Sequence, residues 1–584
     1  MNKFSISNLK RLNHSERLNF CENIREYLIK KISKTGGHIG ANLATIEVTV
    51  AMHFVFKSPI DSFLFDTGHQ GYTHKLLTNR KKLFSTLNTN GGMSRFLTKK
   101  ESKHDLIEAS HAGTAISIGS GIAYSKFIQK NKSNTLVLVG DGSLVEGMSF
   151  EALNYLYELP KDTFFTLIIN DNEMAIDKNI GGLKEILKDK YASRSFFKKM
   201  GLDYFFIENG NDVNAIIKFF KLIKNKKNKS VVHIKTTKGL GLDIAKNHPY
   251  KMHFSMPFDI NNSKSVNPTI SGETMSVLVS KFILKNLNYF KKFKLITPGT
   301  PYASNLEPII AKTRNFVHDV GMAEQHSLGY ATGLSLYGIK PILFIQSTFL
   351  QRAFDQLIHE ISYMEIPITI FCVRSGLAGH DSPTHHGIYD LAYLKSIPNL
   401  TLYSPGSSND LIKKLRNKFI LKKDKNISEI IFLPYEPIEN LTYHKCKNYS
   451  SYDLYYKTIK SNNILILTHV NLLKNSLLLA EKIFKIRKIY PNVICIKRLK
   501  PINFDKMMIY KSKKIIVLEE YSSINGIYSD LNNFIQKNSL NIKVTEFNLG
   551  DGFTQAGDKE YILKSKQLYF NQIFKFLIRN SVID

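Results

Sequence analysis

The chain has 584 residues, 43% of them hydrophobic and 22% charged, which is ordinary for a soluble globular protein of two to four domains. Its formal net charge of +31 would by itself suggest a nucleic-acid or membrane-surface partner. The lysines, however, are scattered among abundant Asn, Ile, Phe and Tyr, as AT-rich codon usage produces, and the lysine-rich run 221–230 has no aromatic residue for base stacking. We therefore expect only salt-dependent, nonspecific adhesion to polyanions, and no specific nucleic-acid or membrane partner.

The cysteines and the amino-terminal segment indicate a cytoplasmic protein. Cys21, Cys372, Cys446 and Cys495 form no CxxC pair, so neither a zinc site nor a disulfide framework is expected, and a reducing compartment fits best. The first 20 residues lack the apolar core of a signal peptide, and no apolar run approaches roughly 18 residues.

Strand-like and helix-like patterns alternate in three stretches, which predicts an α/β fold of three domains, each a mostly parallel sheet flanked by helices. The first domain is expected at 1–265, with strands at 134–142, 163–172 and 230–237 and a helix at 148–159. The polar segment 259–273 is predicted to be a linker.

The second domain is expected at 274–445 and the third at 450–584. Between them, 434–453 is predicted to be an irregular linker. The second domain should contain a long helix over 321–338. Strands are predicted at 315–320, 340–346, 367–374 and 427–433 in the second domain, and at 463–469, 492–498, 514–520 and 541–549 in the third.

A candidate metal site follows two strands of the first domain. Asp141 ends one strand and Asn172 follows the next, and the carboxyl ends of parallel strands joined by one helix open into the same crevice. With a backbone carbonyl such as that of Met174, these oxygens suit Mg²⁺, which usually shares its coordination sphere with a ligand's phosphates. Gly140 and Gly142 would let the backbone approach a diphosphate. "GDG" alone is more often a turn or helix cap, but "GDG" followed by "NDN" after another strand is the pattern of thiamine diphosphate enzymes.

Thiamine diphosphate also requires a carboxylic acid beside its aminopyrimidine ring and an apolar surface for stacking. Glu324, after a predicted strand of the second domain, is the candidate acid, and Phe349 is the candidate stacking residue. By residue type alone, Glu324 would be a solvated helix-end acid and Phe349 a core residue. Four histidines in glycine-containing loops indicate proton handling and substrate binding: His38, His69, His111 and His385.

The motifs together resemble the 1-deoxy-D-xylulose-5-phosphate synthase family of transketolase-like enzymes over nearly the whole chain. They are "GGHIGANLATIEVTVAMHFVF", "DTGHQGYTHKLLT", "GGMSRF", "VGDG", "NDNEM", "GMAEQHS", "STFLQRAFDQ" and "THHGIYDLAYLKSIPNL". The resemblance implies three transketolase-like domains, thiamine diphosphate and Mg²⁺ as cofactors, and a homodimer. It also implies condensation of pyruvate with D-glyceraldehyde 3-phosphate, with release of CO₂, for isoprenoid-precursor synthesis.

Matching positions imply individual roles. Asp141, Asn172 and the Met174 carbonyl would hold the metal, and Glu324 and Phe349 would activate and stack on the cofactor. Further cofactor contacts would come from His69, Ser110, His111, Ala112, Gly142, Ser143 and Leu242, and further catalytic or acceptor contacts from His38, His253, Arg352, Asp381 and His385. Arg374 would bind the acceptor phosphate, for which a guanidinium fork is well shaped.

Several positions depart from the family pattern. Ala112 replaces a serine of the usual "GHSSTSIS", and Leu242 and Gln346 each replace a tyrosine. The family's "YPRG" is "LPYE" at 433–436, with no arginine from 430 to 486. Losing one fork contact to phosphate would weaken acceptor binding about tenfold or more. The cofactor-binding motifs are nearly complete, whereas the motifs that bind the acceptor phosphate are altered.

Two alternatives remain open from the sequence. A transketolase or a pyruvate-decarboxylating relative would share the metal site and the glutamate, although not "STFLQRAFDQ" together with "THHGIYDLAYLKSIPNL". A noncatalytic binding protein could keep the fold while its substrate site decays.

Overall fold

The computed structural model describes residues 4–262, 264, 273–313, 315–423, 427–436, 445–456, 463–504 and 507–583. Its contacts divide the chain into two compact units, Met1–Thr269 with Gly321–Ala323, and Ile270–Val320 with Glu324–Asp584. The expected linker at 259–273 lies largely outside the described residues.

The first unit is built on a five-stranded, fully parallel sheet in the order β1-β2-β3-β5-β4. Its strands are β1 (Ser62–Phe65), β2 (Thr135–Gly140), β3 (Phe165–Asp171), β4 (Asp203–Ile207) and β5 (Lys229–Lys235). The three predicted strands are thereby confirmed as β2, β3 and β5. The predicted helix over 148–159 is α7, which ends earlier, at Tyr155.

The central strands are apolar throughout because both faces of the sheet are covered. Along β2, Leu136 and Leu138 belong to one buried cluster, whereas Val137 and Val139 belong to another. Successive side chains of a strand point to opposite faces, so a strand between two helical layers needs an unbroken apolar run. This is why the run was visible in the sequence.

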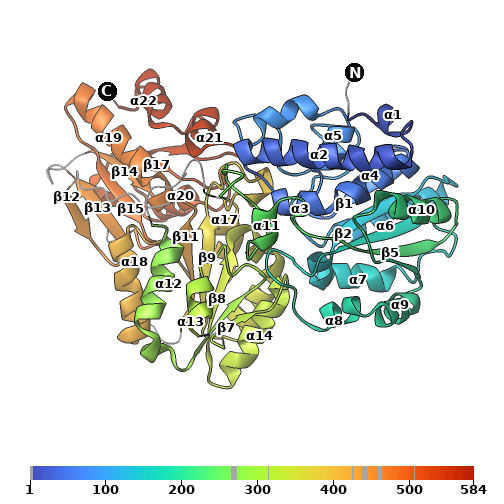
Figure 1. Ribbon diagram of the computed structural model, residues 1–584. Helices are drawn as coiled ribbons and strands as arrows, with labels where there is room; N and C mark the ends of the chain where they lie inside the picture. Colours follow the sequence, from blue (N-terminus) through green and yellow to red (C-terminus); the bar gives the residue numbers. More distant parts are fainter. Residues whose placement is uncertain are drawn as a thin grey trace. The chain divides into compact units, whose positions relative to one another are not determined.

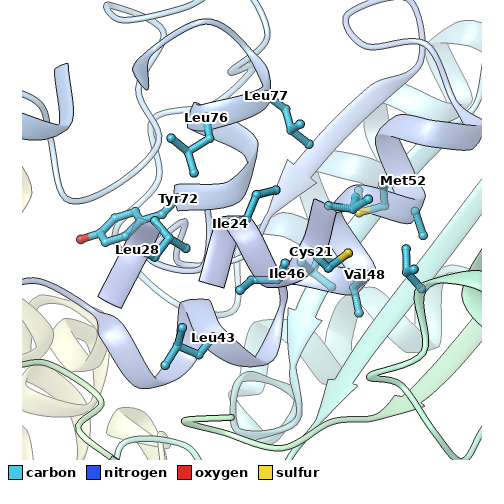
Figure 2. Packing of buried hydrophobic residues seen from close by; sticks show 14 of the residues in the cluster. Cys21, Ile24, Leu28, Leu43, Ile46, Val48, Met52, Tyr72, Leu76 and Leu77 are labelled. Atoms are coloured by element: carbon cyan, nitrogen blue, oxygen red, sulfur yellow. The ribbon is translucent and has the colours of Figure 1, made fainter. Parts of the chain in front are cut away.

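Helices form the two covering layers of this sheet (Figure 1). Those that contribute to one buried cluster include α2, α4, α5 and α10, and those of the other include α6, α7, α8 and α9. Figure 2 shows part of the first cluster, where Ile24 and Leu28 lie among Leu43, Tyr72 and Leu76. The helices are α1 (Ile6–Leu9), α2 (His14–Thr35), α3 (Ile39–Ala44), α4 (Ile46–Val55), α5 (Tyr72–Leu77), η1 (Lys81–Thr86), α6 (Ala115–Ile128), η2 (Asp141–Val145), α7 (Gly147–Tyr155), α8 (Gly182–Lys188), α9 (Lys190–Lys199), α10 (Val213–Ile223) and α11 (Asp243–Asn247).

The second unit contains two sheets. The first of these has seven strands in the order β16-β10-β11-β9-β8-β6-β7, all parallel except the edge strand β16, which pairs antiparallel with β10. The strands are β6 (Phe293–Thr297), β7 (Val317–Asp319), β8 (Lys340–Gln346), β9 (Thr369–Ser375), β10 (Leu400–Tyr403), β11 (Ser428–Pro434) and β16 (Arg498–Lys500). All four strands predicted here are confirmed, and the predicted long helix is α14 (Glu324–Leu336).

The other sheet has six strands in the order β12-β13-β15-β14-β17-β18, with two antiparallel pairings at one edge, β12 with β13 and β13 with β15. The strands are β12 (Lys445–Asn448), β13 (Tyr452–Tyr456), β14 (Ile464–Thr468), β15 (Asn492–Ile496), β17 (Lys514–Leu518) and β18 (Lys543–Phe547). The expectation of an irregular linker at 434–453 is wrong for β12 and the start of β13, because the tyrosines of "SSYDLYY" pair with an apolar neighbouring strand. Residues 437–444 of that expected linker lie outside the described residues.

One buried cluster joins the two sheets of the second unit. It contains Ile370 and Phe432 from the seven-stranded sheet together with Leu467 and Val517 from the six-stranded one. Because the two sheets share this core, they form one compact unit. The division into a second and a third domain stays a prediction. The helices of this unit are α12 (Met275–Lys285), η3 (Leu287–Phe290), α13 (Glu307–Lys312), α14, α15 (Ser347–Leu350), η4 (Gln351–Ala353), α16 (Phe354–Gln356), η5 (Leu357–Tyr363), η6 (Pro383–His385), α17 (Asp390–Lys395), α18 (Ser408–Leu415), η7 (Arg416–Ile420), η8 (Val470–Leu472), α19 (Leu473–Arg487), η9 (Met508–Lys511), α20 (Ile527–Lys537), α21 (Lys559–Ser565) and α22 (Phe570–Arg579).

The α/β class with mostly parallel sheets is confirmed. Among the described residues, no helix has the length and apolar character needed to cross a membrane.

Candidate active site

Asp141 and Asn172 follow neighbouring parallel strands at the carboxyl edge of the first sheet. The register pairs Gly140 of β2 with Asn170 of β3, so Asp141 is one residue beyond this pair and Asn172 is two residues beyond it. The Asn179 amide donates to Oδ2 of Asp141 at 2.8 Å. Oδ1 of Asp141 and Oδ1 of Asn172 are buried and have no hydrogen-bond partner among the described residues. Two buried oxygens without donors fit a cation, since buried acceptors in proteins are otherwise satisfied.

The charge balance of this edge favours a bound cation. Burial, and then the neighbouring Asp171, raise the pKa of Asp141 well above its usual range. Asp171 itself is occupied by His233 and Lys235, each 2.7 Å away, and these hydrogen bonds lower its pKa to about 2 despite burial. In the described part of the chain, no three His, Cys, Asp or Glu side chains are placed to share a metal. A cation here would therefore combine Asp141 with neutral oxygens, as Mg²⁺ sites that also bind phosphates do.

The backbone around Asp141 is closely packed. Gly142 and the buried Ser143 lie in η2, directly after β2. A Cβ on Gly142 would come within 2.4 Å of the Ala175 Cβ, so glycine is required there by the segment that follows Asn172. At Gly140 an added Cβ would meet only the Gln70 amide at 3.4 Å, an ordinary contact. The close approach predicted for both glycines is thus sterically enforced at Gly142 only.

Residues 110–113 are held at the same edge of the sheet. Asp66, directly after β1, accepts hydrogen bonds from the backbone N–H groups of Gly113 and Ala115 at 3.0 and 3.1 Å. Gly113 has φ +85°, and a Cβ there would overlap the Glu146 carboxylate at the start of α7. Ser110 is buried, whereas His111 and Ala112 are half-buried. The segment predicted to touch the cofactor therefore lies beside η2.

Three of the candidate histidines meet in one cluster. The ring centroids of His38, His69 and His253 are 5.0 to 5.6 Å apart. Burial, with Lys238 as the next cause, lowers the pKa of His69 to about 3 and that of His253 well below its usual range. These two imidazoles are therefore neutral at physiological pH and can each accept or donate a proton-sharing hydrogen bond.

Lys238 links the histidine cluster to the loop after Asn172. Its Nζ donates to the Ala175 carbonyl at 2.6 Å and lies 3.3 Å from Nδ1 of His253. Burial lowers its pKa to about 8, partly opposed by Asp141. Leu242, four residues further on, is buried in the apolar cluster of the first unit, where its side chain contributes packing.

The remaining candidates lie in the second unit. Glu324 is the first residue of α14 and is buried, in contrast to the solvated helix-end acid that its residue type suggests. The Phe349 ring in α15 packs edge-on against His385, with centroids 5.8 Å apart, and Nδ1 of His385 lies 2.8 Å from the Ser382 hydroxyl. Arg352 lies in η4, three residues after Phe349, and is half-buried, as is Asp381.

The expected phosphate contact, Arg374, is at the carboxyl end of β9 with φ +59°, and its guanidinium lies 5.5 Å from the centre of the Tyr435 ring. Tyr435 is the residue that the expected match of "LPYE" to the family's "YPRG" sets against the arginine. The next residue, Glu436, pairs with Lys559, whose Nζ also lies 3.1 Å from the buried Glu520. Lys559 thus provides a cation next to Tyr435 and Glu436, but the carboxylates of Glu436 and Glu520 already neutralise its charge. Gln346, at the end of β8, is buried.

Sequence reasoning missed several residues of the first unit's edge: Asp66, Gln70, Glu146, Asn170, Asn179 and Lys238. Gln70 accepts from the Asn170 amide at 2.9 Å and is adjacent to His69. Asn170, at the end of an apolar strand, was visible as a buried polar residue that needs a partner. Nothing local marks Asn179.

Comparison with known proteins places this chain in a family. The 1-deoxy-D-xylulose-5-phosphate synthase model matches residues 2–196, and the transketolase pyrimidine-binding domain model matches residues 288–434. The 1-deoxy-D-xylulose-5-phosphate synthase of Halothermothrix orenii is 31% identical over 95% of this chain and 93% of its own length. The chain belongs to the 1-deoxy-D-xylulose-5-phosphate synthase family. The synthase of Buchnera aphidicola subsp. Schizaphis graminum is likewise 31% identical, over 97% of this chain and 95% of its own.

Members of this family are thiamine diphosphate-dependent transferases that condense pyruvate with glyceraldehyde 3-phosphate in isoprenoid biosynthesis. Among solved structures, transketolase from Campylobacter jejuni is similar with a TM-score of 0.45 and 16% identity, covering 97% of this chain and 100% of that one.

Proposed function

We propose that this chain condenses pyruvate with D-glyceraldehyde 3-phosphate to 1-deoxy-D-xylulose 5-phosphate, with release of CO₂. The family membership supports the reaction, and the observation that carries it to this chain is the pair of buried oxygens, on Asp141 and Asn172, at the carboxyl edge of the first sheet. A chain that had lost its cofactor would gain nothing from keeping two buried acceptors without donors.

Asp141, Asn172 and the Met174 carbonyl would hold Mg²⁺, and the backbone of Gly142 and Ser143 would bind the diphosphate it carries. Ser110, His111 and Ala112 would contact the cofactor from the neighbouring segment, although Ala112 offers no hydroxyl and Leu242 no phenol. Thiamine diphosphate, when bound, supplies a nucleophilic carbon and an electron sink for decarboxylation.

The imidazoles of His38, His69 and His253 would orient the carboxylate and carbonyl of pyruvate and share protons with its oxygens. Because burial keeps His69 and His253 uncharged, they would do so without a fixed positive charge.

In the second unit, Glu324 would bind the aminopyrimidine nitrogen and share its proton, and Phe349 would stack on that ring. Arg352, Asp381 and His385 would contact the acceptor aldehyde or move its proton, and Arg374 would bind the acceptor phosphate. Among the described residues, the Arg374 guanidinium lies over the Tyr435 ring, a contact that leaves its N–H fork for the phosphate.

The oligomeric state, the cellular compartment and the domain division that we propose rest on the same family membership. The protein would act as a homodimer in the cytoplasm, with three domains at about 1–265, 274–445 and 450–584. The four unpaired cysteines, of which only Cys446 is exposed, fit a reducing compartment.

The test is a steady-state assay of the purified protein with both substrates, Mg²⁺ and thiamine diphosphate, following CO₂ and the sugar phosphate. Glu324→Ala should abolish turnover while Mg²⁺-dependent cofactor binding, measured by calorimetry, changes little. Glu307→Ala is the matched control, since Glu307 also begins a helix of the second unit, α13. Two-carbon transfer without CO₂ would instead identify a transketolase, and cofactor binding without any turnover would identify a binding protein.

A further inference from the structure

The loop between β9 and α17, residues 376–389, carries two of the candidate acceptor residues, Asp381 and His385. A pair of backbone hydrogen bonds closes its neck: Gly376 and Gly387 exchange N–H and carbonyl groups at 3.0 and 2.8 Å. Gly387 packs so closely that a Cβ there would lie 1.9 Å from the Ser347 hydroxyl. Beyond this neck, the loop's shape depends on what lies against it.

The segment 550–558, which follows β18 of the six-stranded sheet, contacts this loop at four points. The Gly557 N–H donates to the Gly379 carbonyl at 3.0 Å, and the Tyr389 hydroxyl donates to the Gly552 carbonyl at 3.1 Å. Nε2 of His380 lies 2.8 Å from the Asp558 carboxylate. The fourth point is His386, the most buried of these side chains.

His386 connects the loop to the segment through both ring nitrogens. Nδ1 accepts from the Ala378 N–H at 2.8 Å, and Nε2 lies 3.1 Å from the Gln555 carbonyl. Only the neutral ring with its proton on Nε2 satisfies both contacts, because Nδ1 must accept and Nε2 must donate. Burial lowers the pKa of His386 to about 4, so this form persists through the neutral range.

His386 therefore differs from its neighbour His385. Both nitrogens of His386 are bound to backbone groups, so it has none left for a substrate, whereas the His385 ring lies against Phe349 at the candidate site. We propose that His386 is a positioning residue, which fixes loop 376–389 on segment 550–558 and thereby holds Asp381 and His385 in place for the acceptor aldehyde. The six-stranded sheet, to which no substrate contact is assigned, then contributes to the acceptor side by supporting this loop. The inference rests on the proposed function for the roles of Asp381 and His385.

The test compares His386→Leu with His386→Gln. Leucine removes both hydrogen bonds, whereas glutamine has one acceptor and one donor and can restore them. We expect His386→Leu to raise the KM for glyceraldehyde 3-phosphate about tenfold, as the loss of one to two buried hydrogen bonds predicts, with the KM for pyruvate within about twofold. His386→Gln should recover most of the loss, and His359→Leu, at an exposed histidine of the same unit, should change neither KM. Tyr389→Phe, which removes only the Gly552 contact, should act in the same direction and more weakly.

Hydrogen exchange of the protein without substrates provides a second readout. The amides of Ala378, Gly387 and Gly557 should exchange about tenfold faster in His386→Leu than in the wild type or in His386→Gln. Equal rises in both KM values, failure of glutamine to rescue, or unchanged exchange in His386→Leu would overturn the inference. If the wild-type protein makes no product from the two substrates, the proposed function fails on its own. The exchange data then decide whether His386 holds the loop.

Discussion

The side-chain amide of Asn179 donates a 2.8 Å hydrogen bond to Oδ2 of Asp141, and Oδ1 of the same carboxylate is left buried without a donor among the described residues. One oxygen is thus fixed by the protein while the other is kept for a ligand. Outer partners of this kind orient a metal ligand, and their loss typically costs ten- to a hundredfold in affinity.

We therefore expect Asn179→Ala to weaken Mg²⁺-dependent binding of thiamine diphosphate about ten- to a hundredfold. Asp141→Asn, which removes the charge itself, should weaken it more. Isothermal titration calorimetry at fixed Mg²⁺ measures both. Asn154→Ala, at an exposed position of α7, is the control and should bind normally. Equal affinities for wild type and Asn179→Ala would contradict the assignment of this edge to the metal.

Arg374→Lys should raise the KM for glyceraldehyde 3-phosphate about tenfold and leave that for pyruvate nearly unchanged. A lysine keeps the charge but loses the fork that binds two phosphate oxygens at once. With Tyr435 in place of a second arginine, no other guanidinium within 430–486 compensates. Arg416→Lys, at an exposed arginine of the same unit, serves as the comparison. Parallel changes in both KM values would show that Arg374 does not contact the phosphate.

Asp390→Asn should make the stability of the protein less dependent on pH. Asp390 is buried at the start of α17, where it accepts from the Ser347 hydroxyl, and burial raises its pKa from 3.8 to about 6. The folded state therefore holds a proton that the unfolded state releases, so stability falls as pH rises from about 4 to about 6 and stays low above that. The penalty removed by asparagine is at most about 3 kcal/mol.

Thermal unfolding at pH 4.5 and pH 7.5 measures this effect. The variant should gain several degrees over the wild type at pH 7.5 and little at pH 4.5. Asp162→Asn, at an exposed residue just before β3, should shift neither midpoint. A variant that loses stability at pH 7.5 would mean that the Ser347 contact requires the charged carboxylate.

Lys559→Met should destabilise the second unit. Glu520 is 1% exposed and is paired with Lys559, so removing the cation leaves a buried carboxylate uncompensated, at a cost of about 3 kcal/mol. The expected decrease in the thermal midpoint is about 5 °C or more. Lys564→Met breaks the neighbouring surface pair with Glu560 and should change the midpoint little. If both variants unfold at the same temperature, Glu520 is stabilised by its bonds to the Leu377 N–H and Asn471 alone.

Much of the fold could be predicted because strands covered on both faces are continuous apolar runs. All eleven predicted strands lie in the three sheets, and the helix that begins at Glu324 was located within three residues of its start. Several of the missed strands lie at sheet edges, such as β1, β4 and β12, where only one neighbouring strand pairs with them and fewer apolar residues are needed. Tyr452 of β13 falls within the expected linker because tyrosine also occurs in polar loops, whereas Tyr455 and Tyr456 lie beyond that segment.

By itself, the sequence determined the α/β class, the positions of Asp141 and Asn172 after two adjacent strands, and the family to which the motifs belong. These features depend on residues that are close together in the sequence, because a strand, the residue that ends it and a motif are each contained in one short segment. Only the tertiary structure decided that His38, His69 and His253 meet, that Lys559 reaches Glu436, and that His386 joins its loop to segment 550–558. Such contacts join segments far apart in the chain, and hydrophobic periodicity specifies which face of an element is buried but not which distant loop packs against it.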